Sequence, residues 1–283
     1  MTRDEVIIAP FQTGDELLIP SLVREVYGDG YDSRFYGAES IAEMVHDGLL
    51  LILAKEKGSG RLLGMTGFAT EAANPCLWRT FRRMVSPSAR GCGIASLCEA
   101  EGERLLVEAG KADGFYAQLD VKSPSNPMLA RHGFSLTAVL PAFLGRSAQT
   151  FWFKLTGCDG GSREAEAESR QSIHAIFRVS TDLGTRRLFF QSGGANLFAQ
   201  LAVWAPDSAV TELILSSPTD EDLAYLKSNG WTPCGVLPLW GFSPARLYLK
   251  FRGETHMPLA PEWASGAADL WNSLSGLSTP GGV

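Results

Sequence analysis

Hydrophobic positions divide the first 155 residues into short segments of two kinds. Some are apolar runs of strand length, and others repeat apolar residues every three to four positions, as an amphipathic helix does. The pattern predicts strands at 6–9, 49–54, 62–69, 78–85, 115–121, 136–140 and 149–155, and helices at 15–27, 38–46, 94–109 and within 123–134. The resulting order, β-α-α-β-β-β-α-β-α-β-β, predicts an α/β protein with a mixed (α+β) sheet.

The first of these helices has its own start and break signals. Thr13 is a candidate N-cap, because its hydroxyl can accept a hydrogen bond from the first turn. Pro20 lacks a backbone N–H, so we expect it to split or kink the helix. The polar loop that follows holds Tyr31, Phe35 and Tyr36 shortly after Tyr27.

The pattern of the second half repeats the end of the first. The segment 132–141 matches the segment 229–238, with Gly133 and Gly230 lying 97 positions apart, and 151–155 matches 247–251. A strand is expected at 211–216 and a helix at 219–229, which Thr219 would cap. These matches indicate a partial internal duplication.

Composition suggests where the parts of the chain begin and end. Residues 157–171 are rich in glycine and acidic residues with almost no apolar side chain, as in a solvated linker. We therefore expect one domain at 1–156, a linker at 157–171, a second lobe at 172–253 and a Gly/Pro/Ser-rich tail at 254–283.

Charge and cysteine content exclude several classes of protein. The 283 residues carry a formal net charge of -6, which argues against a general nucleic-acid binder. No apolar run approaches the roughly 20 residues of a membrane span, and the first residues lack the apolar core of a secretory signal. The five cysteines form no CxxC pair, so neither a metal site nor a disulfide framework is indicated. A cytoplasmic protein with reduced thiols is expected.

A glycine-bearing turn joins the strand at 78–85 to the long helix. It reads Arg90-Gly91-Cys92-Gly93 and leads into Ile94. The first N–H groups of a helix lack intrahelical acceptors and favour an anion, and glycines let that anion approach the backbone. The turn fits neither the Gly-x-Gly-x-x-Gly dinucleotide motif nor a Walker loop. It predicts a pyrophosphate site that includes the Arg90 charge.

The turn does match Arg-x-x-Gly-x-Ala, in Arg90, Gly93 and Ala95. This resembles the pyrophosphate loop of the GNAT superfamily of acyltransferases, which bind coenzyme A. The short helix that closes on Gly133-Phe134 resembles the later part of the same pattern. The resemblance covers about residues 4–155 and implies a GNAT-like acyltransferase fold there, with the second lobe as a partial repeat.

The resemblance also implies cofactor contacts. Residues of the turn and the helix start would bind the pyrophosphate, and the end of the strand would offer backbone groups to the pantetheine arm, with an N–H near Val85 polarising the thioester carbonyl. Asn126 is a candidate for the arm and equally for a helix cap. The expected coenzyme A residues are Met84, Val85, Arg90, Gly91, Cys92, Gly93, Ile94, Ala95 and Asn126.

Proton transfer is less well marked. Leu129 occupies the position where many members of the family have a tyrosine acid, and 78–85 lacks their glutamate and has Arg79, Arg82 and Arg83 instead. Those arginines could attract a carboxylate on the acceptor. The other candidates for acid, base or acceptor contacts are Glu71, Asp120, Tyr116, Tyr31 and Tyr36, of which Tyr31, Tyr36 and Glu71 are expected to contact substrate. No general base is assigned.

Together these features predict an acyl-CoA-dependent N-acyltransferase. Acetyl-CoA would be the donor and an amine on a small molecule or peptide the acceptor, without a metal, a nucleic acid or a membrane. A non-catalytic acyl-CoA sensor is the alternative, and an acyl carrier protein is a possible donor. The second lobe lacks Arg-x-x-Gly-x-Ala, and its nearest glycine cluster, 191–195, lacks the cation. It is therefore expected to be a degenerate copy, structural or substrate-shaping, in preference to the alternative of a second coenzyme A site.

Overall fold

The computed structural model describes residues 5–71, 74–140, 149–156, 178–180, 185–190, 210–216, 219–238 and 245–251. The predicted linker at 157–171, the tail at 254–283 and the glycine cluster at 191–195 lie outside these ranges.

The first half has the predicted order of elements. Its strands are β1 (Val6–Pro10), β2 (Leu50–Glu56), β3 (Leu62–Glu71), β4 (Asn74–Val85), β5 (Gly114–Asp120), β6 (Ser135–Leu140) and β7 (Gln149–Leu155). Its helices are α1 (Ile19–Tyr27), α2 (Ala38–His46), α3 (Ile94–Glu108) and α4 (Asn126–Arg131), with short 3-10 turns η2 (Asp15–Leu17), η3 (Ser33–Tyr36) and η4 (Pro87–Ala89). The mixed α/β fold expected from the pattern is confirmed.

The first predicted helix is divided near its proline. Pro20 lies in the first turn of α1, where its missing N–H removes no helical hydrogen bond. The preceding turn, η2, starts after Gly14 in a left-handed conformation, without a side-chain cap. The prediction that Thr13 caps this helix is therefore wrong, and the prediction of a break at Pro20 is confirmed.

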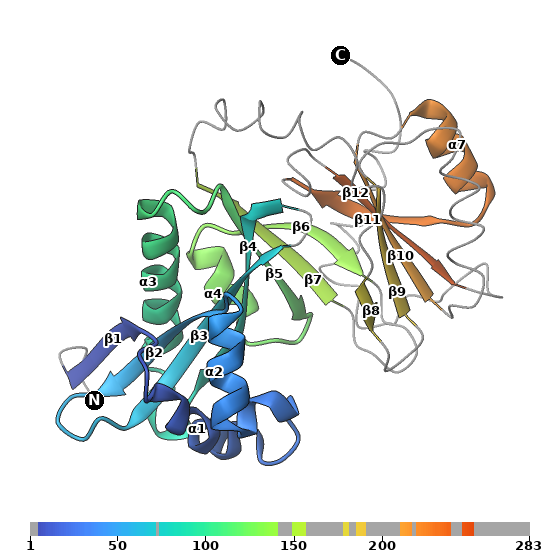
Figure 1. Ribbon diagram of the computed structural model, residues 1–283. Helices are drawn as coiled ribbons and strands as arrows, with labels where there is room; N and C mark the ends of the chain where they lie inside the picture. Colours follow the sequence, from blue (N-terminus) through green and yellow to red (C-terminus); the bar gives the residue numbers. More distant parts are fainter. Residues whose placement is uncertain are drawn as a thin grey trace.

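Helices cover both faces of the first half of the sheet (Figure 1). Leu51 and Leu53 of β2 pack with α1 and α2 on one face, and Ile52 and Ala54 pack with α3 and α4 on the other. This alternation follows from the two-residue period of a strand, and residues 50–54 of β2 are all apolar because both faces are buried there. None of the helices in the described ranges is long and apolar enough to cross a membrane.

A glycine allows α3 to lie unusually close to the sheet. A Cβ placed on Gly102 would lie 2.1 Å from the ring of Phe68 on β3. The sequence gives no hint of this contact, because a glycine inside a helix usually only weakens it. The close contact sets the distance between α3 and the sheet, and with it the position of the helix N-terminus.

In the described ranges, the second half adds five strands and one helix. These are β8 (Arg178–Ser180), β9 (Thr185–Phe190), β10 (Val210–Ser216), α7 (Asp220–Ser228), β11 (Thr232–Leu237) and β12 (Ala245–Phe251). Thr219 caps α7 as predicted, in a reciprocal capping box with Asp222. The strand pattern is similar to that of the first half, since β10, β12 and β11 adjoin in the same order as β5, β7 and β6.

The described strands of the two halves share one sheet of twelve, in the order β1-β2-β3-β4-β5-β7-β6-β11-β12-β10-β9-β8 (Figure 1). They meet where Gly235 of β11 pairs with Ala138 of β6. A Cβ on Gly235 would lie 2.5 Å from the Thr137 carbonyl oxygen, so the two strands approach closely at this point. Each strand also has a register irregularity next to this pair.

Replacing Gly102 with alanine should destabilise the protein. Overpacking against Phe68 is expected to cost about 1–3 kcal/mol, which exceeds the gain of up to about 1 kcal/mol from better helix propensity. Denaturant unfolding followed by circular dichroism measures the change. Phe68→Leu in the Gly102→Ala background should recover part of the loss.

Gly30→Ala is the matched control for this prediction, since a Cβ there meets only ordinary contacts. Equal stability of Gly102→Ala and the parent protein would contradict the close packing of α3 on β3.

Candidate active site

Strands β4 and β5 separate within the sheet. They run parallel and pair only from Leu77 to Arg79 on β4 and from Gly114 to Tyr116 on β5. Beyond this point β4 continues alongside β3, and β5 continues alongside β7. After Arg79, β4 pairs with β3 alone, so its other edge carries backbone groups that another molecule can pair with, towards the carboxyl end of the strand, where ligands commonly bind.

The predicted anion turn follows directly after this opening. Arg90, Gly91, Cys92 and Gly93 are all exposed, and Gly93 forms the N-cap of α3. Gly91 and Gly93 have φ angles of 79° and 76°, which L side chains rarely adopt, and a Cβ at either would meet nothing within 4 Å. Backbone conformation, and not crowding, therefore requires glycine here.

The helix that follows anchors the turn. Ile94 is buried in the core beneath α3, and Ala95 packs half-buried against the same core. The first backbone hydrogen bond of this helix runs from the Leu97 N–H to the Gly93 carbonyl. The N–H groups before Leu97 have no acceptor within a helix and point along its axis towards the turn.

Met84 and Val85 form the end of β4 beside the opening. The Met84 side chain is buried among α1 and α2, and Val85 packs towards α3. Both residues pair with β3 on one side, Met84 with Met65 and Val85 with Gly64. Arg90 donates from Nε to the Val85 carbonyl at 3.4 Å, which connects the turn to the strand.

Asn126 lies across the opening, and its side chain is already fully engaged. Its amide nitrogen donates to the carbonyls of Asp120 and Val121, at 3.0 and 2.9 Å. Its amide oxygen accepts from Thr150 and Trp152, at 3.0 and 2.9 Å. The side chain therefore ties β5 to β7, and the N-cap position of α4 is occupied by Ser125.

A backbone irregularity marks β4 just past the separation. The register with β3 shifts between Met65 and Gly67, and Arg82 has a φ of 57°, the only positive φ of a non-glycine residue in the described ranges. Such conformations cost on the order of 1–3 kcal/mol and persist where the surroundings impose them. The bulge turns Arg82 out of the strand's alternation.

Aromatic rings hold the Arg82 guanidinium. Its centre lies 5.0 to 5.4 Å from the ring centroids of Tyr31, Phe35 and Phe81, within the range of cation–π attraction. Its Nη1 donates to the Tyr31 hydroxyl at 3.1 Å, and its Nη2 donates to Asp32 at 2.6 Å. We call Tyr31, Asp32, Phe35 and Phe81 the Arg82 cage.

The tyrosine-rich loop is closed by its own contacts. Tyr36 donates to the Gly28 carbonyl at 2.6 Å and accepts from the Tyr31 N–H at 2.9 Å, and Tyr27 stacks on Tyr31 with ring centroids 4.5 Å apart. Tyr36 thus shapes the loop and does not line the cavity beside it. Burial raises the pKa of Tyr31, although Arg82 lowers it, so this phenol stays neutral near pH 7.

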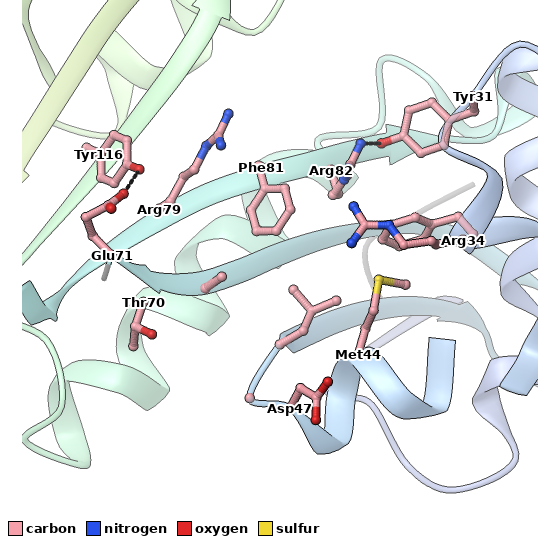
Figure 2. Close-up of a pocket in the computed structure, with 14 residues that line it drawn as sticks. Tyr31, Arg34, Met44, Asp47, Thr70, Glu71, Arg79, Phe81, Arg82 and Tyr116 are labelled. Atoms are coloured by element: carbon pink, nitrogen blue, oxygen red, sulfur yellow. Dashed lines mark hydrogen bonds between the residues drawn. The ribbon is translucent and has the colours of Figure 1, made fainter. Parts of the chain in front are cut away.

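A cavity of about 720 Å³ opens on the α1–α2 face beside the bulge (Figure 2). Part of its wall is aromatic, from Tyr31, Phe35, Phe81 and Tyr116. Part is charged, from Arg34, Arg79, Arg82, Asp47 and Glu71. Two of the three predicted substrate residues, Tyr31 and Glu71, therefore lie in one cavity, although they are 40 positions apart in sequence.

A buried carboxyl–phenol pair forms one end of this cavity. The Tyr116 hydroxyl donates to Glu71, and the two residues are only 0% and 8% exposed (Figure 2). Tyr116 is the last residue of β5 paired with β4, so this pair borders the strand separation. A carboxylate here can accept a proton from an amine in the cavity.

The candidate Asp120 and the leucine at position 129 lie elsewhere. Asp120 accepts from the Lys122 N–H at 2.7 Å in the turn after β5 and does not line the cavity. Leu129 is fully buried in the core on the α3–α4 face. The side chain at position 129 therefore contributes packing there.

Charged residues also lie buried on the opposite face of β4, which the sequence did not reveal. Glu99 of α3 accepts from Arg83 at 2.7 Å and from Thr80 at 2.9 Å. One turn later, Glu103 accepts from Lys154 at 2.6 Å, and burial raises the pKa of its carboxyl. The available signal was their spacing on the inner side of α3, near Cys98 and Leu106.

Comparisons with known proteins give structural matches only. No family model and no curated protein matches the chain. Among solved structures, it is similar to a GNAT-family acetyltransferase from Desulfovibrio desulfuricans, with 18% identity, 53% of this chain and 98% of that chain covered, and a TM-score of 0.44. A GNAT-family acetyltransferase from Brucella melitensis in complex with acetyl-CoA is 21% identical, with 54% of this chain and 90% of that chain covered and a TM-score of 0.40. The ribosomal-protein-S5-alanine acetyltransferase from Vibrio fischeri is 11% identical, with 56% of this chain and 97% of that chain covered and a TM-score of 0.47.

These neighbours are acetyltransferases. Two of them carry the name of the family that the Arg90–Ala95 motif resembles. Each match spans about half of this chain, at identities below 25% and TM-scores below 0.5. Function therefore has to follow from the residues of the site itself. Within the described ranges, no group of three or more His, Cys, Asp or Glu side chains could hold a metal ion.

Replacing Arg82 with alanine should destabilise the fold. The change removes a partly buried ion pair and stacking on three rings, so the free energy of unfolding should fall by about 1–3 kcal/mol. Arg82→Lys keeps the charge but loses the planar stacking. Its free energy of unfolding should lie between those of Arg82→Ala and the parent protein. Urea unfolding of the three proteins measures the order.

Arg104→Ala serves as the control, because Arg104 makes only exposed ion pairs on α3. If Arg82→Ala unfolds at the same urea concentration as the parent protein, the Arg82 cage does not hold the bulge.

Proposed function

We propose that this chain is an acyl-CoA-dependent N-acyltransferase of the GNAT type, which transfers an acetyl group from acetyl-CoA to an amine. The observation that carries the proposal is the separation of β4 and β5 after Arg79 and Tyr116, with an anion turn at one end and a cavity beside it. A donor held along the opening would present its acyl group next to the acceptor cavity.

The residues present fit coenzyme A. Exposed Gly91 and Gly93, the start of α3 and the Arg90 charge suit a pyrophosphate. The free edge of β4 at Met84 and Val85 suits the amide groups of a pantetheine arm, which can pair with a strand edge. Asn126 supports the far edge of the opening, since its own side chain is engaged within the fold.

Electrostatic effects link the two parts of the site. Burial raises the pKa of Tyr27, and both Arg82 and Arg90 lower it. Arg82 of the cavity wall and Arg90 of the anion turn therefore both lie near the Tyr27 ring.

The proposed reaction is direct attack of the amine on the thioester carbonyl. The new bond joins the amine nitrogen to the acyl carbon, the carbon–sulfur bond breaks, and the amine loses a proton while the thiolate gains one. A backbone N–H near Val85 stabilises the oxyanion, and the Glu71 carboxylate accepts the amine proton. A thiolate of pKa near 8.5 leaves without an obligatory acid, which agrees with leucine at position 129.

The cavity suits a small acceptor. Its volume of about 720 Å³ lies within the range of about 300–1,000 Å³ of small-molecule sites. An amine on a peptide is the second candidate, because only its end would have to enter. Nothing in the described residues supports an acyl carrier protein as the donor.

A non-catalytic acyl-CoA sensor is the competing function, and the observation that favours it is the buried Leu129 in place of a tyrosine acid. Thiol release from acetyl-CoA over a panel of amines separates the two. Steady release supports the enzyme, and tight binding of acetyl-CoA without release supports the sensor.

The second half is proposed to be a degenerate repeat at 172–253, joined to a donor-binding domain at 1–156. The matching strand order around the β6–β11 contact and the shared register irregularities support this. In this proposal the second lobe covers the outer edge of β6, which would otherwise be an open strand edge.

Gly93→Glu should abolish coenzyme A binding in isothermal titration calorimetry. The substitution puts a negative charge at the anion turn and forces a side chain onto a φ of 76°. Gly93→Ala imposes the backbone strain alone and should retain weaker binding. Unchanged affinity in Gly93→Glu would remove the anion turn from the donor site.

Glu71→Gln should lower kcat/KM by about 10²–10⁴-fold, the usual contribution of a general base. The remaining rate should rise with pH towards the pKa of the acceptor amine, since no other group then takes the proton. Tyr116→Phe removes the hydrogen bond and keeps the carboxylate, so it should be less damaging. A kcat/KM that is the same for Glu71→Gln and the parent protein, with full acetyl-CoA binding in both, would exclude Glu71 as the base.

A further inference from the structure

The two halves of the sheet meet at strands that hold equivalent places in the proposed repeat (Figure 1). From this contact outwards, the first half continues as β6, β7 and β5, and the second half continues as β11, β12 and β10. The two strands at the contact, β6 and β11, are antiparallel. Two copies of one unit that meet in this way are related by a two-fold axis at the contact.

The strand registers of the two halves agree position by position. Residues 114–120 of β5 pair with residues 149–155 of β7, and residues 210–216 of β10 pair with residues 245–251 of β12. Both strands of the second pair are thus offset by 96 positions from those of the first. This agreement comes from backbone pairing and is independent of the similarity between the two sequences.

The register irregularity beside the contact is also repeated. The β6–β7 register shifts between Leu136 and Ala138, and the β11–β12 register shifts between Pro233 and Gly235. These positions lie 97 apart, which is the offset between the two matched glycines of the sequence repeat. Ala138 and Gly235 are therefore equivalent positions of the proposed repeat, and they are a pair through which β6 and β11 join.

This pair has room for one Cβ atom only. A Cβ on Gly235 would lie 2.6 Å from the Ala138 Cβ and 2.5 Å from the Thr137 carbonyl oxygen. Both distances are well inside the roughly 3.5–4.0 Å at which non-bonded carbon atoms attract. Gly235 also has a φ of 139°, a conformation that L side chains rarely adopt. The alanine on β6 fits because its counterpart on β11 is glycine.

Within the described residues, the second half does not repeat the opening of the first. Residues 185–190 of β9 pair with residues 210–215 of β10 at six consecutive positions, whereas β4 and β5 pair at three. Pairing in the first half ends at Tyr116 of β5, whose counterpart in β10 is Glu212. The second half therefore provides a partner strand on a continuous sheet.

We propose that the β6–β11 contact is a two-fold interface between two copies of one repeat, and that it accepts unlike copies only. A pair of two β6 strands would place Ala138 opposite a second Ala138, with the same overlap of Cβ atoms. Gly235 removes this overlap on β11 alone. The β6 edge thus pairs with β11 of its own chain and not with β6 of another chain, which protects a strand edge from association. The inference rests on the proposed repeat and is independent of the proposed acyl transfer.

The first test measures hydrogen exchange of the full-length protein, in peptides that cover β6 and β11. Gly235→Ala should raise exchange in both peptides by about 10-fold or more, because overpacking opens the contact. Adding Ala138→Gly should recover part of the protection, since the two positions lie opposite each other. Peptides from β1 and β2, at the far edge of the sheet, should exchange as in the parent protein.

Ala9→Gly in the Gly235→Ala background is the matched control. It makes the same replacement in an antiparallel strand pair at the far edge, where Ala9 pairs with Leu53, and it should restore no protection in β6 or β11. Unchanged exchange in Gly235→Ala overturns the inference. A recovery by Ala138→Gly that is no greater than the recovery by Ala9→Gly overturns it also.

The second test determines which strand edges can associate. Gly235→Lys puts a long side chain into the contact and should free the β6 edge. Its mass by light scattering should remain that of one chain, because Ala138 blocks a β6–β6 pair. Ala138→Gly added to Gly235→Lys removes the block and should double the mass.

A dimer of Gly235→Lys alone contradicts the restriction to unlike copies, and a monomer of the combined variant contradicts the two-fold interface. Circular dichroism shows whether each variant is folded. If Gly235→Lys does not fold, the exchange test decides alone. Neither test uses coenzyme A, so their outcome is separate from that of the thiol-release assay of the proposed function.

Discussion

The end of β4 has a sheet partner on one side only, and the candidate site depends on how that strand end is held. Pairing with β3 accounts for one edge. On one face Arg82 contacts three aromatic rings and donates to Asp32. On the other face Arg83 forms an ion pair with the fully buried Glu99. Successive arginines thus fix opposite faces of a strand whose other edge must stay open. A rigid open edge can pair with a ligand without first paying the entropy of being ordered.

The sequence could predict the parts of this arrangement that depend on local pattern. The order of strands and helices, the break at Pro20 and the cap at Thr219 all follow from rules that act over a few residues. The anion turn was visible for the same reason. Glu71 and Tyr31 were recognised as polar candidates, but only the register of β3, β4 and β5 brings them to one cavity.

The features that the sequence could not predict depend on contacts between distant segments. Asp32 and Arg82 are 50 positions apart, Glu71 and Tyr116 are 45 apart, and Gly102 meets Phe68 only because α3 lies flat on β3. The role of Arg82 was hidden most completely, because the bulge reverses the face on which a regular strand would place it. Asn126 shows the converse case, since a residue with the right type and position uses its hydrogen bonds within the fold.

One face of β4 carries a buried ion pair, Arg83–Glu99, and the other carries the partly buried pair Arg82–Asp32. A buried ion pair such as Arg83–Glu99 seldom adds net stability over an apolar pair, because removing both ions from water costs about as much as their attraction returns. It does penalise any shift of β4 against α3, since a shift would leave both charges buried and unpaired. In the same way, the Arg82 cage penalises any shift of β4 against η3. Because α3 begins at the anion turn and η3 borders the cavity, the two contacts fix the anion turn and the cavity relative to Arg82 and Arg83 of β4.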